Sequence, residues 1–328
     1  MRVLAGDVGG TKTALAIVDT AGRRYRVERF ERYPSAEHAG LEEIVERFLV
    51  DEKTRPTAAG FGVAGPVREG RSRITNLPWR LDERRLASDS GIRTVALVND
   101  FAANAFGLPF LGPRQLVTLA RGRRDPDGPI AILGAGTGLG EAGLMRSGTA
   151  EAVVPSEGGH VDFGPRSRLE DRLVVWLRKR FGRATRERIL SGSGLVLLRE
   201  FLSREGVAKS SAAARAEIGA SDDRAAAISR LGLSSRDPLS RAALKWFAEI
   251  YGSETGNLAL QYRATGGVYV AGGIAPKILP VLRTRAFVAA FRNKPPMREL
   301  LAGIPVRVVL DGRLGLYGAA AAAARRST

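Results

Sequence analysis

The fold of this chain is decided by the stretch Val95-Ala96-Leu97-Val98-Asn99-Asp100-Phe101-Ala102-Ala103-Asn104. Its first four residues are apolar and rich in β-branched side chains, which predicts a buried strand. A helix of small residues is expected to begin directly after Asp100. A carboxylate at the C-terminal end of a buried strand lies where open α/β sheets place their chemistry. The alternative is that Asp100 only caps the helix, a role that aspartate fills well.

Two glycine-rich turns occur in the chain, each between two apolar segments. The first is Asp7-Val8-Gly9-Gly10-Thr11-Lys12, and the second is Gly134-Ala135-Gly136-Thr137-Gly138-Leu139-Gly140. Because strands are expected on both sides, each turn is predicted to be a hairpin and not the strand-to-helix turn of a P-loop or Rossmann motif. Glycine lets the backbone approach a ligand and point its N–H groups at anions. The recurrence predicts two related halves whose hairpins clamp a polyphosphate from both sides, although plain hairpin tips remain the alternative.

Polar residues on other predicted turns are candidates for recognising hydroxyl groups. In Glu157-Gly158-Gly159-His160, two glycines hold an acid and one of only two histidines on a tight bend. Together these side chains offer the acceptors and the donor that neighbouring sugar hydroxyls need, while a structural turn is the alternative. Asn76 is a turn residue that could bind a hydroxyl, and Glu187 is by composition an exposed helix charge. Gly272 and Gly273 end a predicted strand and offer a small-residue surface for a base or ribose.

Composition restricts the class of protein. The chain has 328 residues, of which 44% are apolar and 26% charged, as expected for a soluble globular protein with two domains. No apolar run approaches the roughly 20 residues that span a bilayer. The absence of cysteine excludes disulfides, thiolate zinc sites and cysteine nucleophiles, and we expect a cytoplasmic protein without a signal peptide. The net charge of +17 comes from short scattered clusters without interleaved aromatic residues, so we expect no nucleic-acid site.

The Pro- and Gly-containing segment 109–113 predicts a crossing between domains. We expect an α/β protein with two α/β domains around a cleft. The small domain would comprise residues 1–110 plus 305–328, and the large domain residues 111–304 with helical insertions. The alanine-rich helix predicted from about Leu314 to Arg326 would pack back on the first domain.

In this order, the motifs resemble the bacterial glucokinase family, within the actin, hexokinase and heat-shock-70 ATPase superfamily. The resemblance covers nearly the whole chain and implies a ribonuclease H-like, actin-type ATPase fold. It rests on Gly6-Asp7-Val8-Gly9-Gly10-Thr11, Thr75-Asn76 with Trp79, Val98-Asn99-Asp100-Phe101, the run 134–140, the run 157–163, Glu187-Arg188-Ile189-Leu190-Ser191-Gly192 and Ala271-Gly272-Gly273-Ile274. A related repressor and sugar-kinase family carries a cysteine-rich zinc motif, so that branch and its zinc are not expected here.

The resemblance also implies an activity: ATP-dependent phosphorylation of D-glucose at its 6-hydroxyl, feeding glycolysis. Asp100 would be the catalytic base, and Asp7 would reach Mg²⁺ through water. The sugar would be bound by Asn76, Asn99, Asp100, Glu157, His160 and Glu187. The phosphates would be held by Asp7, Gly9, Gly10, Thr11, Lys12, Gly136, Thr137 and Gly138, and the adenosine by Gly272 and Gly273. Two departures from the family pattern are Lys12, where many members have a small polar residue, and Asp311-Gly312-Arg313-Leu314-Gly315, which replaces an Asn-Pro-Gly stretch.

The partners expected are glucose and ATP with Mg²⁺, and the chain is expected to form a homodimer without nucleic acid or membrane. One alternative is a kinase for another hexose, such as mannose, fructose or glucosamine. Another is a non-kinase ATPase of the same fold, for example a chaperone or a filament subunit. Such an ATPase shares the phosphate hairpins but has no reason to carry Glu157, His160 and Glu187.

Overall fold

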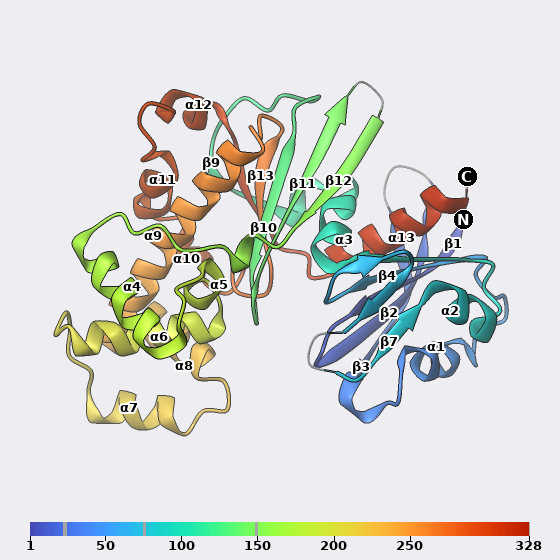
Figure 1. Ribbon diagram of the computed structural model, residues 1–328, viewed down its shortest axis with the longest axis horizontal. Helices are drawn as coiled ribbons and strands as arrows, with labels where there is room; N and C mark the ends of the chain where they lie inside the picture. Colours follow the sequence, from blue (N-terminus) through green and yellow to red (C-terminus); the bar gives the residue numbers. More distant parts are fainter. Residues whose placement is uncertain (22–24, 75–76, 148–149, 328) are drawn as a thin grey trace.

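The computed structural model describes residues 1–21, 25–74, 77–147 and 150–327. Its elements form two lobes, each built on a mixed β-sheet (Figure 1). The first sheet has five strands in the order β3-β2-β1-β4-β8. The strands β1 and β2 form an antiparallel hairpin, while β4 and β8 run parallel to β1. Their bounds are β1 Arg2–Val8, β2 Lys12–Asp19, β3 Arg26–Pro34, β4 Ala58–Val63 and β8 Thr94–Asn99.

The second sheet repeats this plan with one additional strand, in the order β12-β11-β10-β13-β14-β9. Here β10 and β11 form the antiparallel hairpin, and β13 and β14 run parallel to β10. The bounds are β9 Leu116–Ala120, β10 Ile130–Ala135, β11 Leu139–Ser147, β12 Ala150–Ser156, β13 Gly267–Ala271 and β14 Val306–Val309. Both glycine turns therefore lie in hairpins at the same place in two sheets of matching strand order, as the recurrence predicts.

The first lobe is completed by two helices and a small sheet. The periodic apolar residues of the segment 41–48 are buried on one face of α1 (Leu41–Leu49). Helix α2 (Glu83–Ser90) begins where the carboxylate of Asp82 accepts hydrogen bonds from two backbone N–H groups, an N-cap that satisfies otherwise unpaired donors. The small sheet contains β5 (Val67–Arg68), β6 (Arg71–Arg73) and β7 (Arg80–Asp82).

Helices inserted between the strands of the second sheet carry the largest hydrophobic core. The long helix α9 (Pro238–Gln261) packs against α6, α8 and α11 and contacts β10 and β13. Within the described ranges, no helix combines the length and the apolar character that crossing a bilayer requires. The inserted helices are α4 Arg168–Phe181, α5 Arg186–Ile189, α6 Gly192–Arg204, α7 Ala212–Gly219, α8 Arg224–Leu233, α9, α10 Leu279–Leu282, α11 Arg285–Arg292 and α12 Arg298–Gly303.

Two helices join the lobes, namely α3 (Asp100–Gly107) and α13 (Leu314–Ser327). Helix α13 packs on β1, β4 and β8 of the first sheet and lies against α3 (Figure 1). The two helices approach so closely that a Cβ atom on Gly318 would overlap the carbonyl oxygen of Ala103. Helix α3 also contacts β10, β11 and β12, so this one helix touches both sheets.

The chain crosses between the lobes twice, and the structure corrects one predicted boundary. Strand β14 falls within the segment 305–328 expected for the first lobe, yet it pairs with β13 and β9 in the second sheet. The return crossing therefore comes after Val309, and the remaining lobe boundaries stay a prediction. The two crossings meet where the backbone N–H of Leu310 donates to the carbonyl of Gln115, at 2.8 Å, just after the short 3-10 helices Leu108–Phe110 and Pro113–Gln115.

Asp311, in the segment that departs from the family pattern, ties this junction together. Its carboxylate accepts hydrogen bonds from Arg313, from Gln115 and from the hydroxyl group of Tyr317. Burial opposes ionisation of this group, but the hydrogen bonds outweigh it and lower the pKa of Asp311 to about 2. The carboxylate is thus ionised at any physiological pH and links both crossings to α13.

The crossing of α3 and α13 leads to a stability prediction. We expect Gly318→Ala to lower the free energy of unfolding by about 1–3 kcal/mol, because the added methyl group overpacks a closed interface. The matched control is Gly219→Ala, at an exposed helical glycine around which no described atom lies within 4 Å of the new Cβ. This control should not lower stability, since alanine favours helix. Urea denaturation measures both, and equal midpoints for the two variants would contradict the prediction.

Candidate active site

The junction between β8 and α3 places Asp100 at the first position of the helix. The cap is Asn99, whose side-chain oxygen accepts hydrogen bonds from the N–H groups of Phe101 and Ala102, at 2.9 and 3.1 Å. The alternative in which Asp100 is only the helix cap is therefore wrong. The amide nitrogen of Asn99 also donates to the carbonyl of Gly65, at 3.4 Å, which leaves one of its two N–H bonds for a ligand.

The surroundings of Asp100 raise the pKa of its carboxyl group toward neutral pH. Burial raises its pKa to about 6, the charges of Asp7 and Glu157 add to the rise, and a hydrogen bond from the Phe101 N–H opposes it. The two acids that repel it come from different lobes, since Asp7 lies in β1 and Glu157 follows β12. Asp100 consequently lies where the lobes face each other, and it is mostly ionised at neutral pH.

Glu157, His160 and Glu187 converge in the second lobe. The imidazole nitrogen atoms of His160 lie 3.9 Å from the carboxylate of Glu157 and 3.9 Å from that of Glu187. Backbone hydrogen bonds join the two segments that carry them: Arg186 N–H to the Val161 carbonyl, at 3.0 Å, and Phe163 N–H to the Ala184 carbonyl, at 2.9 Å. The side chains of Glu157 and His160 are exposed and that of Glu187 is partly buried, so a ligand can reach all three.

The second glycine hairpin lies directly beside this polar cluster. A carboxylate oxygen of Glu187 accepts a hydrogen bond from the N–H of Leu139, at 3.0 Å, and a Cβ atom on Gly138 would overlap the same oxygen. The carbonyl of Gly136 accepts a hydrogen bond from the N–H of Gly192, at 2.9 Å. Glycine at position 138 is thus required for the close approach of Glu187.

The glycine pair after β13 flanks the same hairpin. Gly272 has a φ angle of 81°, a left-handed conformation that favours glycine, and an added Cβ atom would lie 2.5 Å from the carbonyl oxygen of Ala135. Next to it, Cβ atoms built on Gly136 and Gly273 would meet no described atom within 4 Å. The backbone along these glycines is therefore open to a ligand.

The first glycine hairpin is braced by a residue that the sequence pattern did not identify. The hydroxyl group of Ser35 donates to the carbonyl of Gly9, at 2.8 Å, and shares a hydrogen bond with the hydroxyl of Thr13. The backbone N–H of Ser35 also donates to the carbonyl of Thr11, at 3.0 Å. Ser35 is fully buried, which is a tertiary property that a single serine after a strand does not reveal. Lys12 and Thr11 are exposed at this tip, while Asn76 lies outside the described residues.

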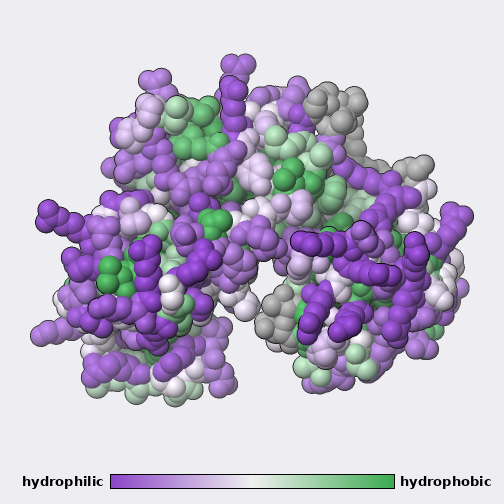
Figure 2. All heavy atoms as spheres, viewed as in Figure 1, coloured by the Kyte–Doolittle hydropathy of each residue, from purple (hydrophilic) through white to green (hydrophobic). Residues whose placement is uncertain are grey.

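Figure 2 shows a hollow between the two lobes, seen from one side. Asp7 lies near the end of β1, close enough to Asp100 to act on its charge. Water reaches this residue, yet protein surrounds it, and burial raises the pKa of its carboxyl group while the charge of Arg32 opposes the shift. The strand register explains why Arg32 lies near Asp7, because Asp7 pairs with Ala14 and Ala14 pairs with Arg32 on the next strand. No described residue donates a hydrogen bond to the carboxylate of Asp7, so its oxygen atoms suit a hydrated divalent cation.

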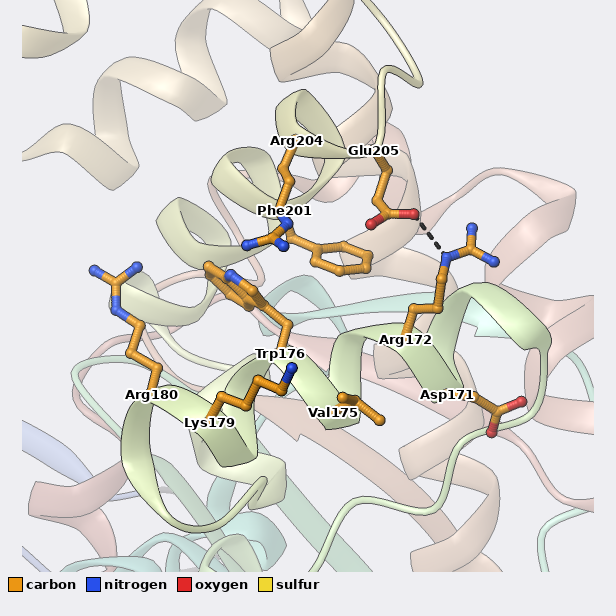
Figure 3. A pocket seen from close by; sticks show the side chains of 9 residues that line it. All are labelled: Asp171, Arg172, Val175, Trp176, Lys179, Arg180, Phe201, Arg204 and Glu205. Carbon is orange, nitrogen blue, oxygen red and sulfur yellow. Dashed lines mark hydrogen bonds and ion pairs between the residues drawn. The ribbon is translucent and has the colours of Figure 1, made fainter.

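A separate surface pocket lies between α4 and α6 (Figure 3). The ring of Trp176 lies beside that of Phe201, and the carboxylate of Glu205 pairs with Arg172 at 2.6 Å. None of the predicted site residues lines this pocket. The predicted residues instead gather around the ends of β1, β8 and β10 and the segment after β12.

Two sheets of matching strand order, each with a glycine hairpin at the corresponding place, define the class of actin-type ATPase folds. The model of the glucokinase family matches residues 4–326 of the chain. A glucokinase from Nostoc sp. is 42% identical over 338 residues, covering 98% of this chain and 99% of the relative. The chain belongs to the glucokinase family. Its predicted fold class, family and enzyme class are thereby confirmed.

Solved structures agree with this assignment. The crystal structure of a glucokinase from an Antarctic psychrotroph superposes with a TM-score of 0.86 at 31% identity, covering 99% of both chains. A ROK-family glucokinase from Streptomyces griseus, solved in complex with glucose and AMPPNP, has the same fold, with a TM-score of 0.67 at 21% identity and coverage of 99% and 100%.

Proposed function

We propose that this chain transfers the terminal phosphoryl group of ATP to the 6-hydroxyl of D-glucose, as a glucokinase. The observation that carries this proposal is the convergence of Glu157, His160 and Glu187 beside a glycine hairpin, close enough for Glu157 to act on the charge of Asp100. A nucleotide-driven machine needs the hairpins but not this cluster of hydroxyl-binding groups. Family membership supports the same activity.

Glucose would be bound by Glu157, His160 and Glu187, whose carboxylate and imidazole groups accept from and donate to neighbouring ring hydroxyls. The free N–H of Asn99 would add a donor on the Asp100 side, and Asn76 is proposed as a further ligand from the family resemblance. A site built for hydroxyl groups discriminates strongly, because a missing hydroxyl leaves buried polar groups unpaired.

Asp100 would act as the catalytic base. Its pKa of about 6 leaves it ionised at neutral pH, yet basic enough to accept the proton of the 6-hydroxyl as the bond to phosphorus forms. In phosphoryl transfer most of the catalytic effect comes from positioning and charge stabilisation. Fixing the sugar with its hydroxyl beside Asp100 and in line with the phosphate is therefore the main task of the surrounding groups.

The nucleotide would lie along the glycine segments. The backbone N–H groups of Gly9, Gly10 and Thr11, with Lys12, would hold the phosphates from the first lobe. Gly136, Thr137 and Gly138 would hold them from the second, and Gly272 and Gly273 would border the adenosine. Mg²⁺, when bound, neutralises charge on the phosphates, and the unpaired carboxylate of Asp7 would hold it through water. The cytoplasmic location, the homodimer and the place in glycolysis expected from the sequence remain part of this proposal.

The activity is tested with a coupled assay that follows ADP production with ATP, Mg²⁺ and a panel of hexoses. We expect turnover to be fastest with glucose and to require a sugar, whereas sugar-independent ATP hydrolysis would indicate the non-kinase alternative. Asp100→Asn should lower kcat by roughly 10²–10⁴-fold, because the base is lost while the side-chain shape is kept. Calorimetry should still detect glucose binding to this variant. Near-normal turnover would remove Asp100 from its role.

The pH dependence of kcat/KM should reveal the ionisation of Asp100. Since Asp100 must be ionised to accept a proton and its pKa is raised to about 6, we expect kcat/KM for glucose to fall as the pH drops below about 6. The fall should approach about tenfold per pH unit, as for one ionisation. A profile that stays flat down to pH 4.5, with the enzyme still folded by circular dichroism, would contradict this assignment.

Substitutions at two glycines of the second hairpin should distinguish effects on sugar binding from effects on nucleotide binding. Gly138→Ala pushes on the carboxylate of Glu187, so we expect KM for glucose to rise by roughly 10- to 100-fold with a small change in KM for ATP. Gly136→Ala places its methyl group in open space and should chiefly raise KM for ATP. Steady-state kinetics with each substrate varied in turn measures both variants. The same pattern in both would show that the hairpin is only structural.

A further inference from the structure

A buried acid lies directly beneath the loop that carries Glu157 and His160. Glu141, in β11, has no exposed surface. A Cβ atom on Gly158 would overlap one of its carboxylate oxygens and would lie 2.8 Å from its carboxyl carbon. Neither carboxylate oxygen accepts a hydrogen bond within the described part of the chain. The turn between Glu157 and His160 thus rests on a carboxyl group that the proposed mechanism does not use.

A second buried acid and a single guanidinium group complete this cluster. Arg186 lies 2.6 Å from the carboxylate of Glu254 on α9 and 3.7 Å from that of Glu141. Glu254 is almost fully buried, and its other oxygen accepts a hydrogen bond from Asn257, at 3.0 Å. The further groups that act on the two acids are Tyr251 and Tyr262, near Glu141, and Lys294 and Arg166, near Glu254.

Among the described residues, Arg186 is the one cation that lies within 4 Å of either carboxylate, while Lys294 and Arg166 attract Glu254 from farther away. One guanidinium faces two carboxylates, and an uncompensated buried charge is strongly unfavourable. Lys294 does not supply the missing contact, because its amino group donates to the hydroxyl of Ser253, at 2.8 Å. Burial raises the pKa of Glu141 to about 7, with Glu254 adding to the rise and Arg186 opposing it. Burial raises the pKa of Glu254 as well, so the two acids titrate as a pair.

We propose that Glu141, Glu254 and Arg186 form a buried support for the sugar-binding loop, in which the two carboxyl groups hold one proton at neutral pH. Glu141 carries the loop through Gly158, and Arg186 is the neighbour of Glu187 in the chain. The support therefore sets the positions of all three sugar-binding side chains. Its members are positioning residues, since none of them contacts the proposed substrate, and the proposal rests on the function proposed above.

Removal of the support is the first test. We expect Glu141→Ala to weaken glucose binding by roughly 10- to 100-fold, measured by calorimetry without nucleotide, because the loop loses the carboxyl group on which Gly158 packs. KM for ATP should stay unchanged. Glu141→Gln keeps the shape and mimics the protonated acid, so its glucose affinity should stay near that of the wild type. The matched control is Asp237→Asn. It alters another fully buried, Arg-paired acid, which caps α9 about 25 Å along the helix from Glu254.

A double-mutant cycle tests the contact itself. Gly158→Ala alone should weaken glucose binding, because its methyl group overlaps the Glu141 carboxyl group. In the Glu141→Ala background that methyl group has room, so the same change should cost much less. Strong non-additivity of this kind identifies a direct interaction. Additive effects, or wild-type glucose affinity in Glu141→Ala, would overturn the positioning role.

The shared proton has its own test, which does not depend on activity. An acid whose folded-state pKa lies above its unfolded value lowers the stability of the fold as the pH rises from the unfolded pKa to the folded pKa. The thermal midpoint of the wild type should therefore fall relative to that of Glu141→Gln between about pH 4.5 and pH 7, and the two curves should run parallel above pH 8. If the thermal midpoints of the two proteins change in parallel between about pH 4.5 and pH 7, the two acids do not share a proton. If the wild type binds no glucose, the proposed function fails while this comparison still decides the protonation of the cluster.

Discussion

The site depends on how closely α3 approaches the second sheet. Phe101, the residue after Asp100, packs on the hairpin of β10 and β11 where Gly134 pairs with Gly140. A Cβ atom on either glycine would fall within the space of the Phe101 ring. With larger residues there, α3 would have to move away, and Asp100 would leave the range in which Glu157 acts on its charge. The packing of the Phe101 ring on these two glycines thus fixes the distance between Asp100 and the second lobe.

Negative charge is the second constraint on this geometry. Asp7 and Glu157, from different lobes, both act on the charge of Asp100, and Arg32 is the cation that acts on Asp7. Burial first, and then these like charges, raise the cost of ionising Asp100 and bring its pKa to about 6. The same burial and repulsion would suit Asp100 to the role of base proposed above. Such shifts of pKa are common where a site is organised for chemistry.

Local patterns in the sequence predicted the parts of the site that depend on neighbouring residues. The strand before Asp100, both glycine hairpins and the tight bend at Glu157 and His160 follow from apolar runs and glycine spacing. Ser35, Arg32 and Glu141 were missed because their roles arise from burial and from the register between strands, which no short segment reveals. Strand β14 was assigned to the wrong lobe for the same reason, since a short apolar strand fits either sheet and only its pairing with β13 and β9 shows which.

The difference between the two halves explains why the fold is used here on a sugar. Each half contributes a hairpin and parallel strands in the same order, but the connection after the third strand differs. In the first half it contains only α1 and a short 3-10 turn, whereas in the second it contains α4 to α9. His160 and Glu187 lie within that longer connection, and so do Arg186 and Glu254 beneath them. With the function proposed above, the duplicated sheets would bind the nucleotide, and the insertion, with its buried charge cluster, would add the surface that selects a sugar.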